Sequence, residues 1–334
     1  MANFLQTKKK LALLHRHPKN RIAETNAAFP YLVEKGIDVL TFKKFNRTGR
    51  IWKEIKSFFW IFYAPFLVVG KDYDVIYLDD SYPFYGIFVK FVCPFSKVVK
   101  RIGDFHLMYY YSGLAYKILH FFEVIEWKMM DEIIAISDVM AARIYKDMGG
   151  PRYPRCVLDP VDTEYFKPDG REDHGTVMFH GVLTRNKNVD ILLEAARRMT
   201  DIIFIVAGDG PDKERLEKLA PENVVFLGWV PLKNIKDLIA NCAIGVALRS
   251  NNPGNEYVVT SPFLQYGIMG KPCLVTRRKV FGEYKWQFST VDEMVEKITY
   301  LLDHPEEGEK LRQYVLEHHD AKKIAEEIFE VLIA

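Results

Sequence analysis

TVMFHGVLTRNKNVDILLEAARRM, residues Thr176–Met199, holds the pattern from which the fold can be predicted. TVMFHG is a short apolar run that ends at a glycine, as a buried strand does. NVDILLEAARRM then places Val189, Leu192 and Ala196 on one face of a helix. A buried strand followed directly by an amphipathic helix is the repeating unit of a parallel sheet, so this stretch predicts an α/β protein.

The same alternation recurs on both sides of this stretch. Further strands are expected at LALLH, IDVLTF, DVIYLDD, VVKRIGDFH and EIIAIS upstream, and at IIFIVAGDGP, NVVFLG, IGVALR and CLVT downstream. Residues 149–175 between them are rich in Gly, Pro and charge and form the best linker candidate. We therefore expect two Rossmann-like, doubly wound domains, residues 1–165 and 166–334, that face a central cleft. A last helix at about 321–332 could pack back on the first domain.

Composition limits the class of protein. The chain has 334 residues, 49% of them hydrophobic, which suffices for two domains of ordinary size. A net charge of +2 argues against a nucleic-acid binder. Cys93, Cys156, Cys242 and Cys273 stand singly, so no zinc or redox motif is indicated and reduced thiols in a cytosol are expected.

No signal peptide is recognised, and the longest apolar stretch is too short to cross a membrane. That stretch, Phe58 to Gly70, contains Pro65 and falls short of the ~20 residues that a spanning helix needs. The sequence therefore predicts a cytoplasmic protein that is soluble or peripheral at the membrane.

Candidate phosphate ligands follow the strand TVMFHG. Arg185 and Lys187 lie at the start of the next helix. Cationic side chains together with free backbone N–H groups bind phosphate at such a position. The alternative is that both residues are solvated loop cations.

Two other strand ends carry weaker signals. VAGDGP contains Asp209 between two glycines that permit a sharp turn and close approach of the backbone, although a plain turn before a helix fits equally well. FLGWVP ends a strand with Trp229 and Val230, which could stack on a base or pack in the core.

The segment NPGNEYVVTSPFLQYGIMGKP predicts an anion site at a helix start. Open amides and the hydroxyls of Thr260 and Ser261 suit an anion there. Glu256, with Tyr257 beside it, could accept hydrogen bonds from sugar or ribose hydroxyls, or Glu256 could be an ordinary surface carboxylate.

Taken in order, these segments resemble a known family. GVLTRNKNVDILLEA, IIFIVAGDGPDKERLEKL, NVVFLGWVP and SPFLQYGIMGKP are similar to the donor half of family 4 glycosyltransferases of the GT-B fold. EIIAISDVMAARI and PVDTEYFKP resemble the end of the family's first domain and its linker. The likeness covers residues 132–275 well and the first hundred residues only loosely.

The resemblance implies a nucleotide-sugar donor held by the second half and an acceptor held by the first. Lys187 matches the lysine that meets the donor diphosphate. The family's partner arginine falls at Val182 here, and Arg185 could substitute for it. Trp229 and Val230 match positions beside the nucleobase.

Two carboxylate positions of the family are altered. Glu256 lies near the first glutamate of its E-x7-E motif, with a spacing one residue longer, and Gln265 occupies the place of the second. Glutamine still accepts through its carbonyl but loses charge-assisted strength. His106, after KRIGDF, matches an acceptor-side histidine that approaches the donor sugar, or it is a plain loop histidine.

The first loop of the chain also departs from the family. The family's glycine-rich loop after the first strand is missing, and His15, His17, Pro18 and Asn20 stand there instead.

The function predicted from the resemblance is transfer of a sugar from a nucleoside-diphosphate sugar, UDP or GDP favoured, to an acceptor hydroxyl. His106, Lys187 and Glu256 would be the catalytic residues, and the family's retention of anomeric configuration is carried over. No metal or further cofactor is expected, because Asp79-Asp80 is a bare pair and no DxD motif ends a strand.

The acceptor side suggests a membrane. Residues 1–60 contain thirteen Lys/Arg and four Asp/Glu, and Arg50, Lys53 and Lys56 recur among aromatic residues at helical spacing. Such a basic helix, here within residues 43–62, can lie in the interface of an anionic membrane, or it can be a core helix with a solvated edge. The acceptor could then be lipid-linked or another glycan.

Two rival functions stay open. The departures at Val182 and Gln265 are compatible with a non-catalytic scaffold that binds nucleotide sugars. A nucleotide-sugar epimerase or hydrolase of the same fold would need a pair of acid/base side chains in the cleft, and no convincing pair is present.

Overall fold

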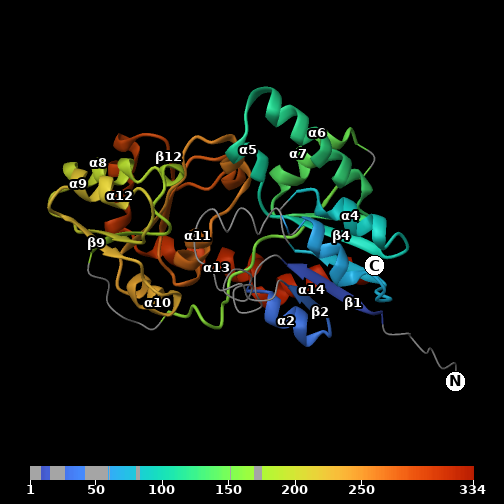
Figure 1. The fold of residues 1–334 in the computed structure, drawn as a ribbon. Helices are drawn as coiled ribbons and strands as arrows, with labels where there is room; N and C mark the ends of the chain where they lie inside the picture. Colours follow the sequence, from blue (N-terminus) through green and yellow to red (C-terminus); the bar gives the residue numbers. More distant parts are fainter. Residues whose placement is uncertain are drawn as a thin grey trace, which may run out of the picture. The chain divides into compact units, whose positions relative to one another are not determined.

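The computed structural model describes residues 9–15, 27–41, 59, 61–79, 83–150, 152–168 and 175–334. The chain divides into two compact units, residues 1–160 with 321–334, and residues 161–320. Each unit is built on a six-stranded sheet whose described strands pair in parallel, with helices packed on it (Figure 1). The predicted α/β architecture of two parallel-sheet halves is confirmed.

The first unit has strand order β2-β1-β3-β4-β5-β6. Its strands are β1 (Leu11–His15), β2 (Asp38–Thr41), β3 (Val75–Leu78), β4 (Lys97–Ile102), β5 (Glu132–Ala135) and β6 (Arg155–Cys156). Its labelled helices are α2 (Phe29–Glu34), α4 (Tyr85–Val92), α5 (His106–Tyr110), α6 (Gly113–Met129), α7 (Asp138–Met148) and α14 (Ala321–Ile333). Residues 61–68 form a further helix.

The last helix of the chain belongs to this first unit. Ile324, Ala325 and Ile328 of α14 are buried against Leu32 of α2 and against the sheet. The chain therefore enters the second unit after Pro160, and returns to the first at Ala321. The boundary predicted from the sequence, after residue 165, lies a few residues later.

The second unit has strand order β12-β11-β10-β7-β8-β9. Its strands are β7 (Val177–His180), β8 (Phe204–Ala207), β9 (Val224–Gly228), β10 (Ile244–Ala247), β11 (Cys273–Thr276) and β12 (Gln287–Phe288). Its α-helices are α8 (Asp190–Arg198), α9 (Lys213–Leu219), α10 (Leu232–Ala240), α11 (Ser261–Ile268), α12 (Val291–Asp303) and α13 (Glu306–His318). Three single turns of 3₁₀-helix are η1 (Arg185–Lys187), η2 (Pro253–Tyr257) and η3 (Lys279–Phe281).

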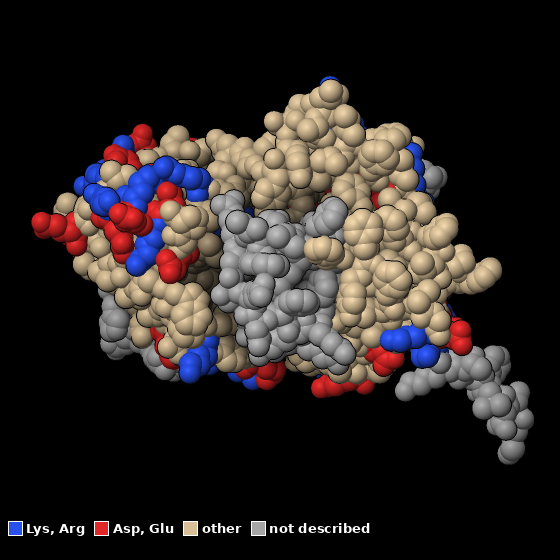
Figure 2. Space-filling model, in the orientation of Figure 1, with Lys and Arg blue, Asp and Glu red and all other residues tan. Residues whose placement is uncertain are grey.

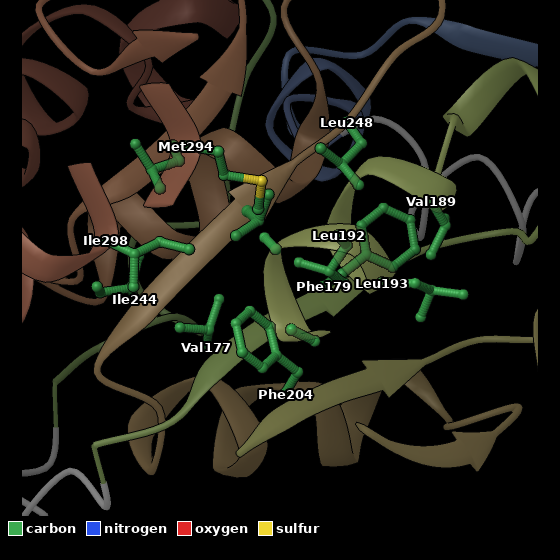
Figure 3. Packing of buried hydrophobic residues seen from close by; sticks show 14 of the residues in the cluster. Val177, Phe179, Val189, Leu192, Leu193, Phe204, Ile244, Leu248, Met294 and Ile298 are labelled. Carbon is green, nitrogen blue, oxygen red and sulfur yellow. The ribbon is translucent and has the colours of Figure 1, made fainter. Parts of the chain in front are cut away.

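Both faces of the second sheet are covered by helices. Successive side chains of a strand point to opposite faces, so those of β7 enter two different cores. Val177 and Phe179 of β7 join a core with α8 and α12, which Figure 3 shows through Leu192 and Ile298. Met178 points the other way, into a core formed with α10, α11 and α13. Strands buried on both faces read as continuous apolar runs, which is why these strands could be predicted from sequence.

A buried ion pair lies in the first unit. Lys100 is on the buried β4, and its Nζ lies 2.8 Å from Oε1 of Glu126 on α6, with side chains 1% and 0% exposed. The Glu126 carboxylate also accepts the backbone N–H groups of Phe84 and Gly86, at 2.9 and 2.8 Å, where α4 begins. This pair therefore joins the sheet to two helices through charge-assisted hydrogen bonds.

Two segments for which the sequence makes predictions lie wholly or mostly outside the described residues. They are the loop with His17, Pro18 and Asn20, and most of segment 43–62, of which residues 59, 61 and 62 are helical. Within the described residues, no helix combines the length and apolar character needed to cross a bilayer.

Candidate functional site

The strand order of the second unit defines where a ligand is expected. In the sheet, β8 and β9 lie in sequence order on one side of β7, whereas β10 lies on the other side of β7. The carboxyl ends of β7 and β10 therefore flank a topological switch point, the usual binding position in open α/β sheets. The loops that leave these strands, residues 181–189 and 248–260, form the candidate site.

One asparagine ties these two loops together. The Asn186 carbonyl accepts the Ser250 N–H at 2.8 Å, and Asn186 Oδ1 accepts the Ser250 hydroxyl at 2.6 Å. Asn186 Oδ1 also accepts from Nδ2 of Asn255 at 3.0 Å, and Asn255 is 1% exposed. The loop after β7 is thus fixed to the loop after β10 by direct hydrogen bonds.

The turn after β8 completes this assembly. The Leu183 N–H donates to the Asp209 carbonyl at 2.9 Å, and the Gly181 N–H donates to the Ala207 carbonyl at 3.0 Å. A Cβ added at Gly208 would lie 1.9 Å from the carbonyl oxygen of Gly181, so only glycine permits this approach. The glycines of VAGDGP, as expected, form a sharp turn with close backbone contact.

Lys187 lies near the end of β7. It closes η1 and is partly buried. Burial, together with the smaller effect of the Lys187 charge, lowers the pKa of His180, the last residue of β7, to about 3. The His180 ring meets the Tyr266 ring in the second half of α11 edge-on, with ring centroids 5.1 Å apart, so α11 packs beside the same strand end. An ammonium group and a neutral imidazole therefore lie together at the switch point.

Arg185 takes a different position from Lys187. Its side chain is 72% exposed, and its Nε lies 3.2 Å from Oδ1 of Asp212. Asp212 is also held by Arg215, which lowers the pKa of the Asp212 carboxyl. Arg185 thus lies at the exposed edge of the candidate site.

The first turn of α11 carries buried polar oxygens that the described residues do not satisfy. Thr260 is the N-cap residue but its hydroxyl makes no capping bond, and its Oγ1 is buried without a hydrogen-bond partner among the described residues. The same holds for Oε1 of Gln265, one turn further on. Buried polar groups are almost always hydrogen-bonded in native proteins, so these two oxygens indicate a bound ligand or water.

Glu256 has a partner elsewhere. Its Oε2 accepts the backbone N–H of Lys279 at 3.0 Å, at the start of η3. The neighbouring Arg278 guanidinium donates to the carbonyls of Arg249 and Ser250, at 2.7 and 2.6 Å. Burial lowers the pKa of Arg278, and the negative charge of Glu256 opposes this shift. Glu256 and Arg278 therefore brace the loop after β10 from the side of β11.

The remaining predicted donor residues are spread over the same edge of the sheet. Asp209 is exposed, and its Oδ1 accepts the N–H of Gly210 at 2.8 Å. Trp229, in the turn after β9, is 72% exposed, whereas Val230 packs partly against the core. Tyr257 is 9% exposed at the end of η2, and Ser261 is exposed at the start of α11.

The first unit places His106 at the carboxyl end of its own sheet. His106 is the first residue of α5 and follows β4 by a short turn. A charged group lies at the same end of the sheet: Arg101 pairs with Asp159 and lies 3.5 Å from Asp79, whose Oδ1 accepts the Tyr77 hydroxyl at 3.1 Å. Among the described residues, no cluster of three or more His, Cys, Asp or Glu side chains could hold a metal ion.

Removing the side chain that joins the two loops should weaken nucleotide binding. We expect Asn186→Ala to cost about 1–3 kcal/mol of stability, because it leaves buried donors of Ser250 and Asn255 short of an acceptor. It should also lower the affinity for UDP or GDP at least fivefold, since the loops lose their fixed spacing. Calorimetric titration of both nucleotides measures this.

Asn223→Ala is the matched control for this variant. Asn223 Nδ2 donates to three carbonyls, of Ala196, Met199 and Ile202, at the opposite end of the sheet. A similar loss of stability with unchanged nucleotide affinity is expected. Equal nucleotide affinities in the two variants would show that Asn186 has no part in the site.

Sequence comparisons find a family model that is similar to the second unit. Residues 161–318 match the family described as "Glycosyl transferases group 1". Alpha-D-kanosaminyltransferase of Streptomyces kanamyceticus is 26% identical over 183 residues, a match that covers 46% of this chain and 44% of that protein. The chain thus spans less than half the length of this curated relative.

Solved structures share the whole architecture. HepE of Anabaena, crystallised with UDP and glucose, has a TM-score of 0.72 at 15% identity, over 98% of this chain and 100% of HepE. Sucrose-phosphate synthase of Thermosynechococcus elongatus has a TM-score of 0.75 at 11% identity, over 97% and 98% of the two chains. The chain has the GT-B fold of these structures, and its second unit matches the model of glycosyl transferases group 1, so the predicted resemblance is confirmed at this level.

Proposed function

We propose that the protein is an enzyme that transfers a sugar from a nucleoside-diphosphate sugar to an acceptor hydroxyl. The observation that carries the proposal is the group of residues at the switch point of the second unit. Lys187, which is partly buried, lies in one of two loops that Asn186 holds together. The other loop leads into α11, where the Thr260 hydroxyl is buried without a hydrogen-bond partner among the described residues. Cations and helix amides in this arrangement suit a diphosphate.

The chemistry requires stabilisation of a departing diphosphate. The bond between the anomeric carbon and the phosphate oxygen breaks, and negative charge grows on that oxygen. Lys187 and the open amide of Ser261 would stabilise this charge. The acceptor oxygen bonds to the anomeric carbon, and the leaving phosphate takes the acceptor proton, as a retaining transfer without a metal allows.

The other predicted residues receive roles that follow from their positions. Trp229 offers an exposed indole on which a base can stack. Gln265 would contact the ribose through its buried Oε1. Glu256 supports the loop after β10 and would reach the sugar only with its second carboxylate oxygen. Arg185 would close over the diphosphate from the exposed edge.

The donor is proposed to be a UDP- or GDP-sugar, and the enzyme to belong to family 4. HepE of Anabaena was crystallised with UDP and with UDP-glucose, which supports a uridine nucleotide. A TarM variant of S. aureus was solved with UDP and alpha-GlcNAc-glycerol. These ligands belong to those proteins, and they make UDP-sugars the first donors to test here.

The first unit is proposed to hold the acceptor, a glycan or a lipid-linked glycan, with His106 approaching the donor sugar. We place the protein in the cytoplasm or peripherally at a membrane. The charged group formed by Arg101, Asp79 and Asp159 at the same sheet end offers hydrogen-bonding partners for sugar hydroxyls.

A thermal-shift screen with UDP, GDP, ADP and TDP sugars tests the proposal first. The expected result is that sugars of one nucleotide class stabilise the protein, and that turnover follows with one or more members of a panel of acceptors. A non-catalytic scaffold is the second candidate, because Val182 is 59% exposed at the place of the family arginine. Stabilisation by a nucleotide sugar without turnover on any acceptor would favour the scaffold, and no stabilisation at all would reject both functions.

The neutral amide at position 265 leads to a separate prediction. Gln265→Glu restores the family's carboxylate, so we expect nucleotide affinity to rise about fivefold, or about 1 kcal/mol, through a charge-assisted bond to ribose. Gln265→Met, of similar volume but without an acceptor, should lower the affinity. Titration with UDP and GDP compares the unaltered chain with the two variants. Identical dissociation constants would show that Gln265 does not contact the nucleotide.

A further inference from the structure

Helix α6 of the first unit is amphipathic in the inverted sense. Its buried face carries Glu123 and Glu126 beside Trp127, while its exposed face carries Leu114, Ile118 and Phe121, which are 73%, 51% and 62% exposed. A helix of a globular protein normally turns its apolar stripe to the core and its charges to water. The exposed stripe of α6 therefore requires an explanation outside the fold of the unit.

The buried acids of α6 are fully engaged, so the inversion is stable as it stands. Glu126 pairs with Lys100, and Glu123 Oε2 lies 2.9 Å from Nδ1 of His120. The other nitrogen of His120, Nε2, lies 3.2 Å from Oδ2 of Asp147 on α7. These two carboxylates raise the pKa of His120 to about 9, so its ring is a cation at neutral pH. A rotation of α6 that buried the apolar stripe would break two contacts with other elements, Glu126 with Lys100 of β4 and His120 with Asp147 of α7.

The exposed stripe belongs to a wider apolar surface. We define this apolar surface by the exposed side chains of α4–α6 and of the neighbouring helix 61–68. They are Phe62, Phe66, Phe88, Phe91, Phe95, Tyr110, Tyr111, Leu114, Ile118, Phe121 and Phe122. The rings of Phe62 and Phe88 lie 5.6 Å apart, which joins helix 61–68 to α4. Large exposed apolar patches of this kind mark interaction sites.

The exposed charges on α6, the central helix of the apolar surface, are all positive. Between His106 and Met129 both acids are buried, and the exposed charged side chains are Lys117 and Lys128. Figure 2 shows the region of α4, α5 and α6 as almost continuously uncharged, with coloured atoms toward its margins. The partner of this surface must therefore be apolar and tolerate, or prefer, positive charge.

These features favour a lipid bilayer over a second copy of the chain. A symmetric dimer through this surface would set the α6 lysines of one protomer near those of the other, with no exposed α6 acid to compensate them. An anionic bilayer complements the lysines, whose stems can lie along apolar surface while their ammonium groups reach phosphates. We propose that the apolar surface of α4–α6 and helix 61–68 docks the first unit on an anionic membrane, with its aromatic side chains inserted at the interface.

This proposal differs from the prediction for segment 43–62, because α4–α6 lie outside that segment. It also stands apart from the proposed transferase activity, since vesicle binding is measured without donor or acceptor. Failure of one therefore leaves the other unaffected.

Flotation of the full chain with vesicles tests the proposal. We expect the chain to float with phosphatidylcholine vesicles that contain phosphatidylglycerol, and the triple variant Leu114→Ser/Ile118→Ser/Phe121→Ser to bind at least tenfold more weakly. The matched control is Ile203→Ser/Leu219→Ser/Val225→Ser, which removes three exposed apolar side chains from the second unit and should float like the unaltered chain. Circular dichroism and thermal melting establish that both variants are folded.

A second pair of measurements separates the apolar and the charged contributions. Lys117→Glu/Lys128→Glu should remove the preference for anionic over neutral vesicles, while the serine triple variant should lose binding even at low salt, where the basic residues 1–60 act most strongly. The proposal is overturned if the unaltered chain does not float, or if the serine triple variant floats as well as the control. It is also overturned if sedimentation shows a dimer that the serine triple variant dissociates.

Discussion

Lys187→Ala is expected to reduce turnover by about 10²–10³-fold, equivalent to about 3–4 kcal/mol of transition-state stabilisation. Lys187 is partly buried beside the end of β7, and its charge is close enough to lower the pKa of His180. In such a position an ammonium group interacts strongly with a developing phosphate charge, because little water screens it. Initial rates with the donor found by thermal shift provide the measurement.

Two further variants control for loss of charge alone. Lys218→Ala removes a lysine of α9 that is 71% exposed and pairs only with Glu214 in the described contacts, so rates should stay within twofold. Arg185→Ala should fall between the two, because its exposed guanidinium already pairs with Asp212. If Lys187→Ala retained a near-normal rate, the assignment of Lys187 to the diphosphate would be rejected.

Glu126→Gln is expected to destabilise the first unit by about 3–5 kcal/mol. The substitution removes the carboxylate that pairs with Lys100, whose side chain is 1% exposed, and breaking a buried ion pair by removing one partner carries a penalty of this size. It also weakens the hydrogen bonds that the carboxylate accepts from Phe84 and Gly86 at the start of α4. Hydrogen exchange of amides in β4 and β5 reports on this unit separately from the second.

The control for this variant is an exposed ion pair. Glu214→Gln breaks the ion pair of Glu214 and Lys218, whose side chains are 83% and 71% exposed. It should lower the free energy of unfolding by less than about 0.5 kcal/mol. Combining Glu126→Gln with Lys100→Met should recover part of the loss, since the buried Lys100 charge is then removed together with its partner. Equal stability of Glu126→Gln and Glu214→Gln would contradict the role given to the buried pair.

The fold could be read from the sequence where burial and pattern agree. Val177 to His180 are apolar or buried throughout because both faces of β7 are covered, and such runs are recognised as strands. Helix α6 was missed because its periodicity conflicts with its position: its acids are buried, where Glu126 pairs with Lys100, and Leu114, Ile118 and Phe121 face out. No local rule anticipates a helix whose polar face is satisfied by residues from β4 and α7.

The candidate site was predicted in part. Lys187, Thr260 and Gln265 are identified by their places after apolar runs, and all three lie at loops or helix turns beyond strand ends. The roles of Asn186, Asn255 and Arg278 depend on hydrogen bonds across 28 to 69 residues of sequence, which composition and spacing do not reveal. In the sequence, Asn186 lies between Arg185 and Lys187, and this position beside two cations was the only local sign of a role in the site.

The central claim is that a diphosphate binds at the switch point of the second unit. A crystal structure of the chain with UDP or GDP tests it most directly. We predict phosphate oxygens within hydrogen-bond distance, about 2.7–3.2 Å, of Lys187 Nζ and of the Ser261 N–H, with the Thr260 hydroxyl satisfied. A nucleotide bound elsewhere, or this position filled by protein side chains in the presence of saturating nucleotide, would contradict the account.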